Sequence, residues 1–348
     1  MINDSLAQYS TLAFVTAIAI YVLAFIGFTV DAARGSQVRS DRKLEAKQRE
    51  RELVGAGAPV GVEDSKAAQS SSAEGGADAS TQGDDAVPGG AAMTALRFAM
   101  TLTVAAAVVH LAGVVMRGVA TGRVPWGNMY EFSMTGSAAV TIMFLGISAW
   151  NKDLRHLGAF IFGPMLLLMM VAQTAWYLPA AHLTPSLQNS YWLVIHVFVA
   201  IMSIALFTIA AVTSLLQLLT ARREAKALAG DVTAEGRVHI LDRLPGSKKL
   251  EQLSFQINAV GFVLWTFTLI AGSIWAKYAW GRYWGWDPKE VWTFVIWVVY
   301  AAYLHARATQ GFRGSRAAYF ALAGFGCIII NYTIVNTVIN GLHSYSGL

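Results

Sequence analysis

The sequence predicts an all-α, polytopic membrane protein of about eight transmembrane helices, and three observations lead to this fold class. Of its 348 residues, 55% are hydrophobic and only 14% are charged, which is below the charge content usual for a soluble domain. Apolar runs of about 18 residues or more recur along the chain, and each is long enough to cross a hydrocarbon core as a helix. These runs lack the alternation that is typical of a transmembrane β-barrel.

The apolar runs divide the chain into its expected elements. Each run must satisfy its backbone polar groups internally within the bilayer, which requires a helix. The first run has neither the charged start nor the small-residue cleavage site of a signal peptide, so a retained helix is expected. The predicted spans are about 11–30, 96–116, 131–150, 157–177, 191–219, 253–274, 291–309 and 316–338.

Lysine and arginine residues predict the orientation of these helices. Positively charged loops tend to stay on the cytoplasmic side of a membrane. The segments that hold 21 of the 26 Lys and Arg residues are 31–97, 151–156, 220–252 and 306–316. We therefore expect these segments to be cytoplasmic and both termini to be extracytoplasmic. Because the charges follow this topology, the net charge of +5 does not indicate a nucleic-acid partner.

The segment 31–95 differs in composition from the rest of the chain. A charged stretch, RSDRKLEAKQRERE, leads into a region rich in Ala, Gly, Ser and Asp. Such a sequence has too little apolar surface to offset the entropy of ordering. We expect a disordered cytoplasmic linker that separates an outlying N-terminal helix (1–30) from a seven-helix body (96–348).

The loop 275–292, WAKYAWGRYWGWDPKEVW, carries the strongest chemical signal. It holds five of the 11 tryptophans of the chain. One or two tryptophans here would be ordinary interfacial residues. Five in 18 positions, interleaved with glycines, favour a flat apolar platform that the backbone can approach closely. The side chains expected to carry it are Trp280, Trp284 and Trp286, and a porphyrin is the flat ligand that suits them.

The end of this loop also has the pattern of a helix start. Asp287 is placed as an N-cap, Pro288 as the first helical residue, and Glu290 as the third residue of a capping box. Asp287 is therefore expected to position the loop, in a way that is compatible with ligand binding. We expect no catalytic role for it.

Two histidines lie at the predicted level of the tryptophan loop. His196 opens the fifth span from the outer side, and His343 follows the eighth span on the same side. Each alone would more often be structural. Together, on either side of an aromatic platform, they suit an axial pair on heme iron. For His110, within the second span, we expect a packed, hydrogen-bonded role ahead of ligation.

His305 lies at a different depth from this outer pair. It follows Glu290 by 15 residues, which places it about 22 Å deeper on a continuous helix. It cannot share an iron with His196 and His343 at that distance. It is either a satisfied core histidine or the ligand of a second, inner heme position whose other ligand comes from a partner chain. The single cysteine, Cys327, forms no internal disulfide or CxxC pair, so any thiol chemistry must involve another protein.

Three motifs carry a resemblance to a known family. The string WGRYWGWD (280–287) resembles the WWD signature of the heme-handling proteins of cytochrome c maturation. Together with VPWGNMYEF (124–132) and LQNSYWLVIHV (187–197), it makes residues 96–348 similar to the CcsA (ResC) family of system II. The first span and the segment after it lie outside this similarity.

The resemblance implies a heme relay. His196 and His343 match the external histidines of the family, and His305 matches its transmembrane histidine, whose companion ligand belongs to a CcsB (ResB) partner. Heme b would be the transported substrate, presented in reduced form outside a bacterial plasma membrane for attachment to the CxxCH segment of apocytochrome c. A thioredoxin-like reductant would serve the thiols. The chain would then be part of a holocytochrome c synthase, or heme lyase, complex.

Three other classes of protein remain as alternatives. A system I heme exporter carries the same WWD loop, and a topology of six spans would favour it. A b-type electron-transfer subunit needs repeated histidine pairs on facing helices, and no predicted helix here carries two well-spaced histidines. A proton-coupled transporter usually carries intramembrane acids, whereas residues 154–223 and 291–348 contain no Asp or Glu.

Overall fold

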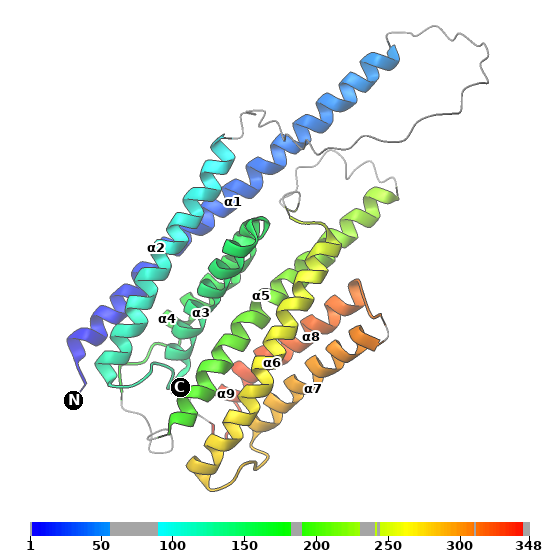
Figure 1. Ribbon diagram of the computed structural model, residues 1–348. Helices are drawn as coiled ribbons and strands as arrows, with labels where there is room; N and C mark the ends of the chain where they lie inside the picture. The colour runs from blue at the N-terminus through cyan, green and yellow to red at the C-terminus, as the bar shows by residue number, and fades with distance from the viewer. Residues whose placement is uncertain are drawn as a thin grey trace, which may run out of the picture.

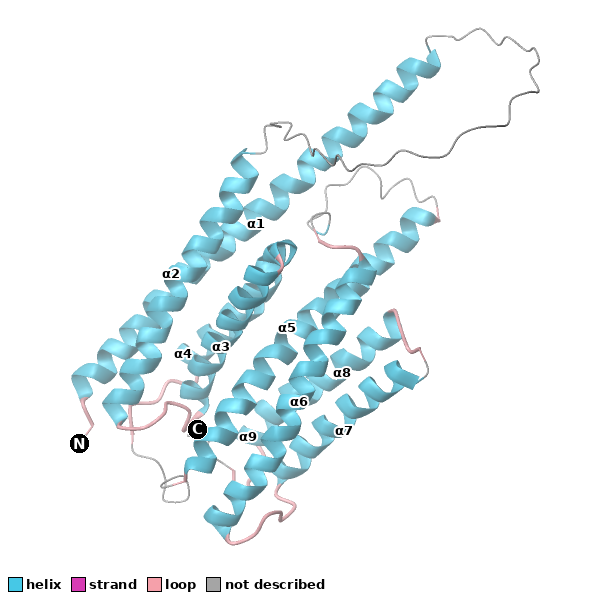
Figure 2. Cartoon of the chain, in the orientation of Figure 1, coloured by secondary structure: helices cyan, strands magenta, loops and turns pink. Residues whose placement is uncertain are grey.

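The computed structural model describes residues 2–55, 90–181, 190–229, 241, 244–309 and 311–343. Within these ranges the chain is helical and has no strand (Figure 2), which confirms the predicted all-α class. The helices are α1 (Asp4–Gly55), α2 (Gly90–Thr121), α3 (Met129–Trp150), the short 3₁₀ helix η1 (Lys152–Leu157), α4 (Gly158–Thr174), α5 (Tyr191–Leu228), α6 (Ser247–Trp280), α7 (Pro288–Thr309), α8 (Ser315–Tyr332) and α9 (Ile334–Thr337).

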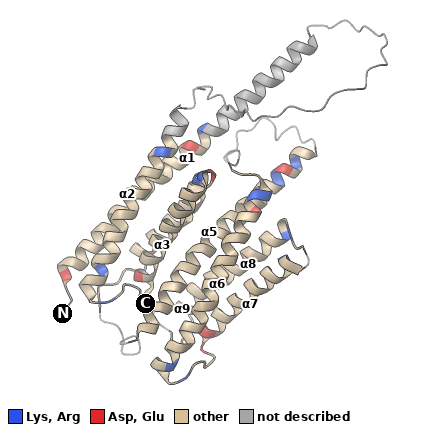
Figure 3. Ribbon diagram, in the orientation of Figure 1, with Lys and Arg blue, Asp and Glu red and all other residues tan. Residues whose placement is uncertain are grey.

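Eight helical segments of the described chain are long and apolar enough to cross a membrane. They run side by side in one elongated bundle (Figure 1). Charged residues lie mainly near the helix ends, while the middle of the bundle carries almost none (Figure 3). This arrangement is expected because a charge in the hydrocarbon region is costly. The prediction of eight spans is therefore confirmed.

Helix α1, expected from the sequence to be outlying, packs against α2 and α4. Phe14 and Tyr21 of α1 are fully buried, and the Tyr21 ring stacks on Phe162 of α4 at 5.4 Å between centroids. The Tyr21 hydroxyl also lies 3.4 Å from Nδ1 of His110. His110 is itself fully buried, which confirms its packed role. Helix α1 packs in this way because it carries a buried face of small and aromatic residues that fits between α2 and α4.

The expected linker is also partly helical. Helix α1 continues to Gly55, and α2 begins at Gly90. The charged stretch within 31–55 is rich in Lys, Arg, Glu, Gln and Ala, which are strong helix formers. Residues 31–55, expected to belong to a disordered linker, are therefore part of α1. Residues 56–89 lie outside the described part of the chain.

One end of the bundle gathers the loops that carry the predicted site. The backbone N–H of Asn3 donates to the Ala120 carbonyl at 3.0 Å, which places the start of α1 beside the end of α2. The backbone N–H of Leu342 donates to Asp287 of the α6–α7 loop at 2.6 Å. Both ends of the described chain lie at the end of the bundle that holds this loop (Figure 1), as eight crossings require.

The packing of α1 gives a first testable prediction. A methyl group at Gly158 would lie 2.5 Å from Cε1 of Phe28, whose ring is buried between α1 and α4. Gly158→Ala should lower the free energy of unfolding by about 1–3 kcal/mol, the usual cost of overpacking. Gly146→Ala is the matched control because that position has open space around it. Equal thermal stability of the two variants in detergent would contradict the packing of α1 against α4.

Candidate functional site

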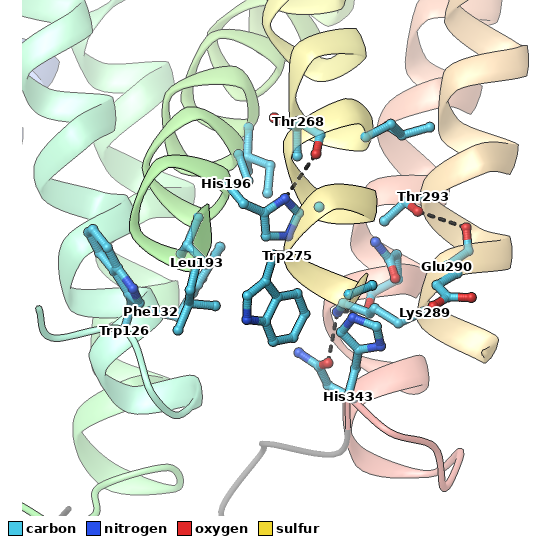
Figure 4. A pocket seen from close by; sticks show the side chains of 18 of the residues that line it. Trp126, Phe132, Leu193, His196, Thr268, Trp275, Lys289, Glu290, Thr293 and His343 are labelled. Atoms are coloured by element: carbon cyan, nitrogen blue, oxygen red, sulfur yellow. Dashed lines mark hydrogen bonds between the residues drawn. The ribbon is translucent and has the colours of Figure 1, made fainter. Parts of the chain in front are cut away.

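A pocket lies between α5, α6 and α7 at the end of the bundle that holds the α6–α7 loop (Figure 4). Its walls are mainly apolar and aromatic, with a few polar groups that converge on it, which is typical of small-molecule sites. The lining residues labelled in Figure 4 are Trp126, Phe132, Leu193, His196, Thr268, Trp275, Lys289, Glu290, Thr293 and His343.

His196 projects into this pocket from the first turns of α5. Its Nδ1 donates to the carbonyl oxygen of Thr268 on α6 at 2.9 Å. The imidazole stacks nearly parallel to the indole of Trp275, with 6.0 Å between centroids and 9° between planes. A methyl group at Gly272 would lie 2.7 Å from Cε1 of His196. A glycine is therefore required there for α6 to approach the ring this closely.

His343 enters the same pocket from the segment after α9. Its Nδ1 lies 2.7 Å from Oδ2 of Asp287, whose other oxygen accepts the N–H of Leu342. The edges of the Trp275 and Trp280 rings meet the imidazole at 5.6 and 4.7 Å between centroids. The structure thus brings both outer histidines to one cavity, on either side of Trp275 (Figure 4).

Asp287 is the residue that places His343. Burial alone would raise the pKa of its carboxyl group. The hydrogen bonds from His343 and from the backbone of Leu342 outweigh that effect and hold the pKa below its usual value. The carboxylate is only 7% exposed. It is therefore a buried negative charge whose donors come from the C-terminal segment of the chain.

The predicted capping box is confirmed. Oδ2 of Asp287 accepts the N–H of Lys289 at 3.3 Å, and Oε2 of Glu290 accepts the N–H of Asp287 at 3.1 Å. Glu290 also accepts the N–H of Gly285 at 2.8 Å and pairs with Arg282 at 2.9 Å. One buried carboxylate therefore fixes both sides of the loop and the start of α7.

The three predicted tryptophans have three different environments. Trp284 lines the pocket. Trp280 packs against the His343 ring. Trp286 is 72% exposed and has a φ of 60°, which a bulky side chain rarely adopts. The rings of Trp284 and Trp286 meet at 89°, so the two do not form one flat surface, and Trp275 contributes the second aromatic wall of the pocket.

His305 lies apart from this pocket. Its side chain is exposed on α7 and does not line the cavity. The possibility of a satisfied core histidine is therefore wrong, because His305 is not in the core.

Sequence reasoning missed a buried ion cluster beside the pocket. Glu131 is fully buried and pairs with Arg117 at 3.1 Å and with Arg123 at 2.7 Å. Its Oε2 also accepts the N–H of Gly127 at 2.9 Å. Trp126 and Gly127 both line the pocket, so this cluster holds one wall of it. The signal was present in the sequence, since Arg117 and Arg123 are two of the few cations in the predicted outer segments.

Comparison with known proteins identifies the family. A family model described as cytochrome C assembly protein matches residues 126–343. The chain belongs to the cytochrome c assembly protein family. The matched segment begins at Trp126 and ends at His343, so it contains every residue that lines the pocket.

Individual relatives agree with this assignment. The chain is 36% identical over 250 residues to the cytochrome c biogenesis protein CcsA of Parasynechococcus marenigrum (strain WH8102), covering 66% of this chain and 80% of that protein. It is 35% identical over 269 residues to the protein of the same name from Synechococcus sp. (strain RCC307), covering 72% and 85%. The predicted membership of the CcsA family is confirmed, and with it a role in cytochrome c biogenesis, which involves heme and apocytochrome c.

The Glu131 cluster gives a second prediction. Glu131→Gln leaves two buried or nearly buried arginines without their counter-charge, and breaking such a pair costs about 3–5 kcal/mol. Lys249→Gln is the control, because its pair with Asp153 is exposed and is worth about 0–1 kcal/mol. Unfolding in detergent should show a large loss for Glu131→Gln and almost none for Lys249→Gln. Similar losses would mean that the cluster does not hold the wall.

The Asp287–His343 contact gives a third prediction, on pH. A carboxyl group whose pKa is lowered by folding contributes stability above its unfolded pKa, and that stability is lost as the pH falls through the folded value. Wild type should therefore be more stable than Asp287→Asn at neutral pH. The difference should shrink as the pH falls below 3.8, the ordinary carboxyl value. A difference in melting temperature that stays constant down to pH 3 would contradict the assigned role of the carboxylate.

Proposed function

We propose that this protein is the heme-handling subunit of a system II cytochrome c synthetase. It receives heme b across the plasma membrane and presents reduced heme at the outer face for covalent attachment to apocytochrome c. The observation that carries the proposal is that His196 and His343, from distant parts of the chain, line one aromatic pocket. Membership of the cytochrome c assembly family supports it.

The hydrogen bonds of the two histidines favour iron ligation. Each ring donates from Nδ1 to an oxygen, the Thr268 carbonyl for His196 and the Asp287 carboxylate for His343. A neutral imidazole that donates from Nδ1 has its lone pair on Nε2, and such partners fix the tautomer and the ring orientation of metal ligands. The carboxylate also raises the basicity of the His343 ring. Trp275 and Trp284 supply apolar walls for the porphyrin.

Attachment itself is an addition reaction. Each thiol of the CxxCH segment adds across a vinyl group of heme, so that sulfur bonds to one vinyl carbon and the hydrogen goes to the other. The reaction consumes no oxidant, but it requires reduced thiols, and a thioredoxin-like partner supplies the reductant. Cys327, the single cysteine of the chain, lies in α8 and does not line the pocket. The histidine of CxxCH then replaces one axial ligand and releases the product.

The inner heme position is proposed to need a second chain. His305 is exposed on α7. Only 17% of the apolar stretch of α7 is buried inside the chain, against 33–50% for the other seven spans. A CcsB (ResB)-like membrane subunit that covers α7 would supply the second ligand at this depth. Both termini and the pocket are proposed to face the extracytoplasmic side, and the pattern of Lys and Arg supports this orientation.

The alternatives are less well supported. A system I exporter was expected to show six spans, whereas the described chain has eight. A b-type electron-transfer subunit was expected to place two histidines on a helix. Each of the described helices α2, α5 and α7 carries a single histidine instead.

The fourth prediction tests the axial pair. The full chain, co-expressed with its proposed partner and purified in detergent, should carry heme with the absorption spectrum of a six-coordinate complex. His196→Ala and His343→Ala should each lose or shift that spectrum, and added imidazole should restore it by filling the vacated coordination position. His305→Ala should reduce heme loading without changing the absorption spectrum of the heme that His196 and His343 hold.

The matched control is His156→Ala. His156 is paired with Asp31 at 3.1 Å and does not line the pocket. The absorption spectrum of His156→Ala should therefore match that of wild type. A heme-free wild-type complex would overturn the proposed function. Unchanged spectra for both outer variants would show that these histidines are structural.

A further inference from the structure

Lys289 is a cation in the wall of the pocket that heme ligation leaves without a role. It is the second residue of α7, is partly buried, and lines the same cavity as the two histidines. Its Nζ donates to the backbone carbonyl of Asn331 at 2.9 Å and to Oδ1 of Asn336 at 2.7 Å. Figure 4 shows the side chain between Glu290 and His343 at the edge of the cavity.

Both acceptors of this ammonium group are neutral. The nearby carboxylates have other donors. Glu290 pairs with Arg282 and accepts two backbone N–H groups. Asp287 accepts hydrogen bonds from the His343 ring and from the backbone of Leu342. Among the described residues, no hydrogen bond joins Nζ of Lys289 to a carboxylate. Asp287 acts on this charge through space but accepts no hydrogen bond from Nζ. Removing a charge from water is costly unless it is paired and hydrogen-bonded, so a negatively charged ligand group that accepts directly from Nζ is favoured at this corner.

The ammonium group also has donor capacity left. It carries three N–H donors, and the two contacts with Asn331 and Asn336 use two of them. A ligand oxygen can accept the third without breaking either contact. A charge-assisted hydrogen bond of this kind is about twice as strong as a neutral one, so the corner fits a carboxylate.

We propose that Lys289 binds a propionate carboxylate of the porphyrin and so fixes which edge of the macrocycle faces the start of α7. The inference rests on the proposed function. Heme has two propionates on one edge and its two vinyl groups elsewhere on the ring. Anchoring the propionate edge at Lys289 therefore determines where the vinyl groups meet the thiols of the incoming segment. Lys289 acts here as a positioning residue.

A purely structural role is the competing explanation, because Lys289 joins α7 to the ends of α8 and α9. The experiment must therefore measure something that a structural cross-link does not change. Lys289→Gln removes the charge but keeps an N–H donor for the same acceptors. Lys277→Gln is the matched control, because Lys277 is at the same end of the bundle, donates to the Gly281 carbonyl at 2.8 Å, and does not line the pocket.

The fifth prediction compares two ligands by absorption titration of the full chain in detergent, ferric heme and its dimethyl ester, in which both carboxylates are uncharged. Wild type and Lys277→Gln should bind the diacid about tenfold more tightly than the ester, the effect of about 1.4 kcal/mol. Lys289→Gln should bind the ester as wild type does and should lose most of the preference for the diacid.

Each outcome has a separate meaning. If wild type binds both ligands equally, or if Lys289→Gln weakens both equally, Lys289 is a cross-link and the propionate site is wrong while the proposed function stands. If wild type binds neither ligand, the proposed function fails and this inference fails with it. Circular dichroism and gel filtration of Lys289→Gln establish that the variant is folded.

Discussion

The carboxylate of Asp287 joins the C-terminal segment of the chain to the start of α7, and the pocket depends on that contact. It accepts the ring N–H of His343 and the backbone N–H of Leu342. A methyl group at Gly341 would lie 2.6 Å from Oδ1 of Asp287, so the segment passes too close for a larger residue. Because His343 follows the last helix, this contact is what brings it to the level of His196.

Two further buried carboxylates hold the walls of the pocket. Glu290 accepts backbone N–H groups on both sides of Trp286, which explains why the backbone of that tryptophan adopts a positive φ and why its ring points outward while Trp284 lines the cavity. Glu131 accepts the N–H of Gly127, the residue after Trp126, and so holds the segment that lines the opposite wall. Buried ion pairs add little net stability but strongly penalise the loss of one partner, so they specify where these loops lie.

Local patterns in the sequence predicted the features that depend on residues close together in the chain. Apolar length predicted the eight spans, the order of spans placed His196 and His343 at one end, and the capping box followed from four consecutive residues. The features that the sequence did not predict depend on contacts between segments that are separate in the chain. The packing of α1 against α4 depends on the space that Gly158 leaves for Phe28. The sequence contained Arg117 and Arg123, but only the structure shows that both pair with the buried Glu131. Composition alone also did not predict that α1 continues as a helix through the charged stretch.

Electron paramagnetic resonance of the ferric heme complex, prepared with ¹⁵N-labelled histidine, tests the central claim most directly, because it counts the axial nitrogens. The account predicts a low-spin signal with hyperfine coupling to two histidine nitrogens, one from α5 and one from the C-terminal segment. A high-spin signal, or coupling to a single histidine nitrogen, would contradict the claim that His196 and His343 together hold the iron.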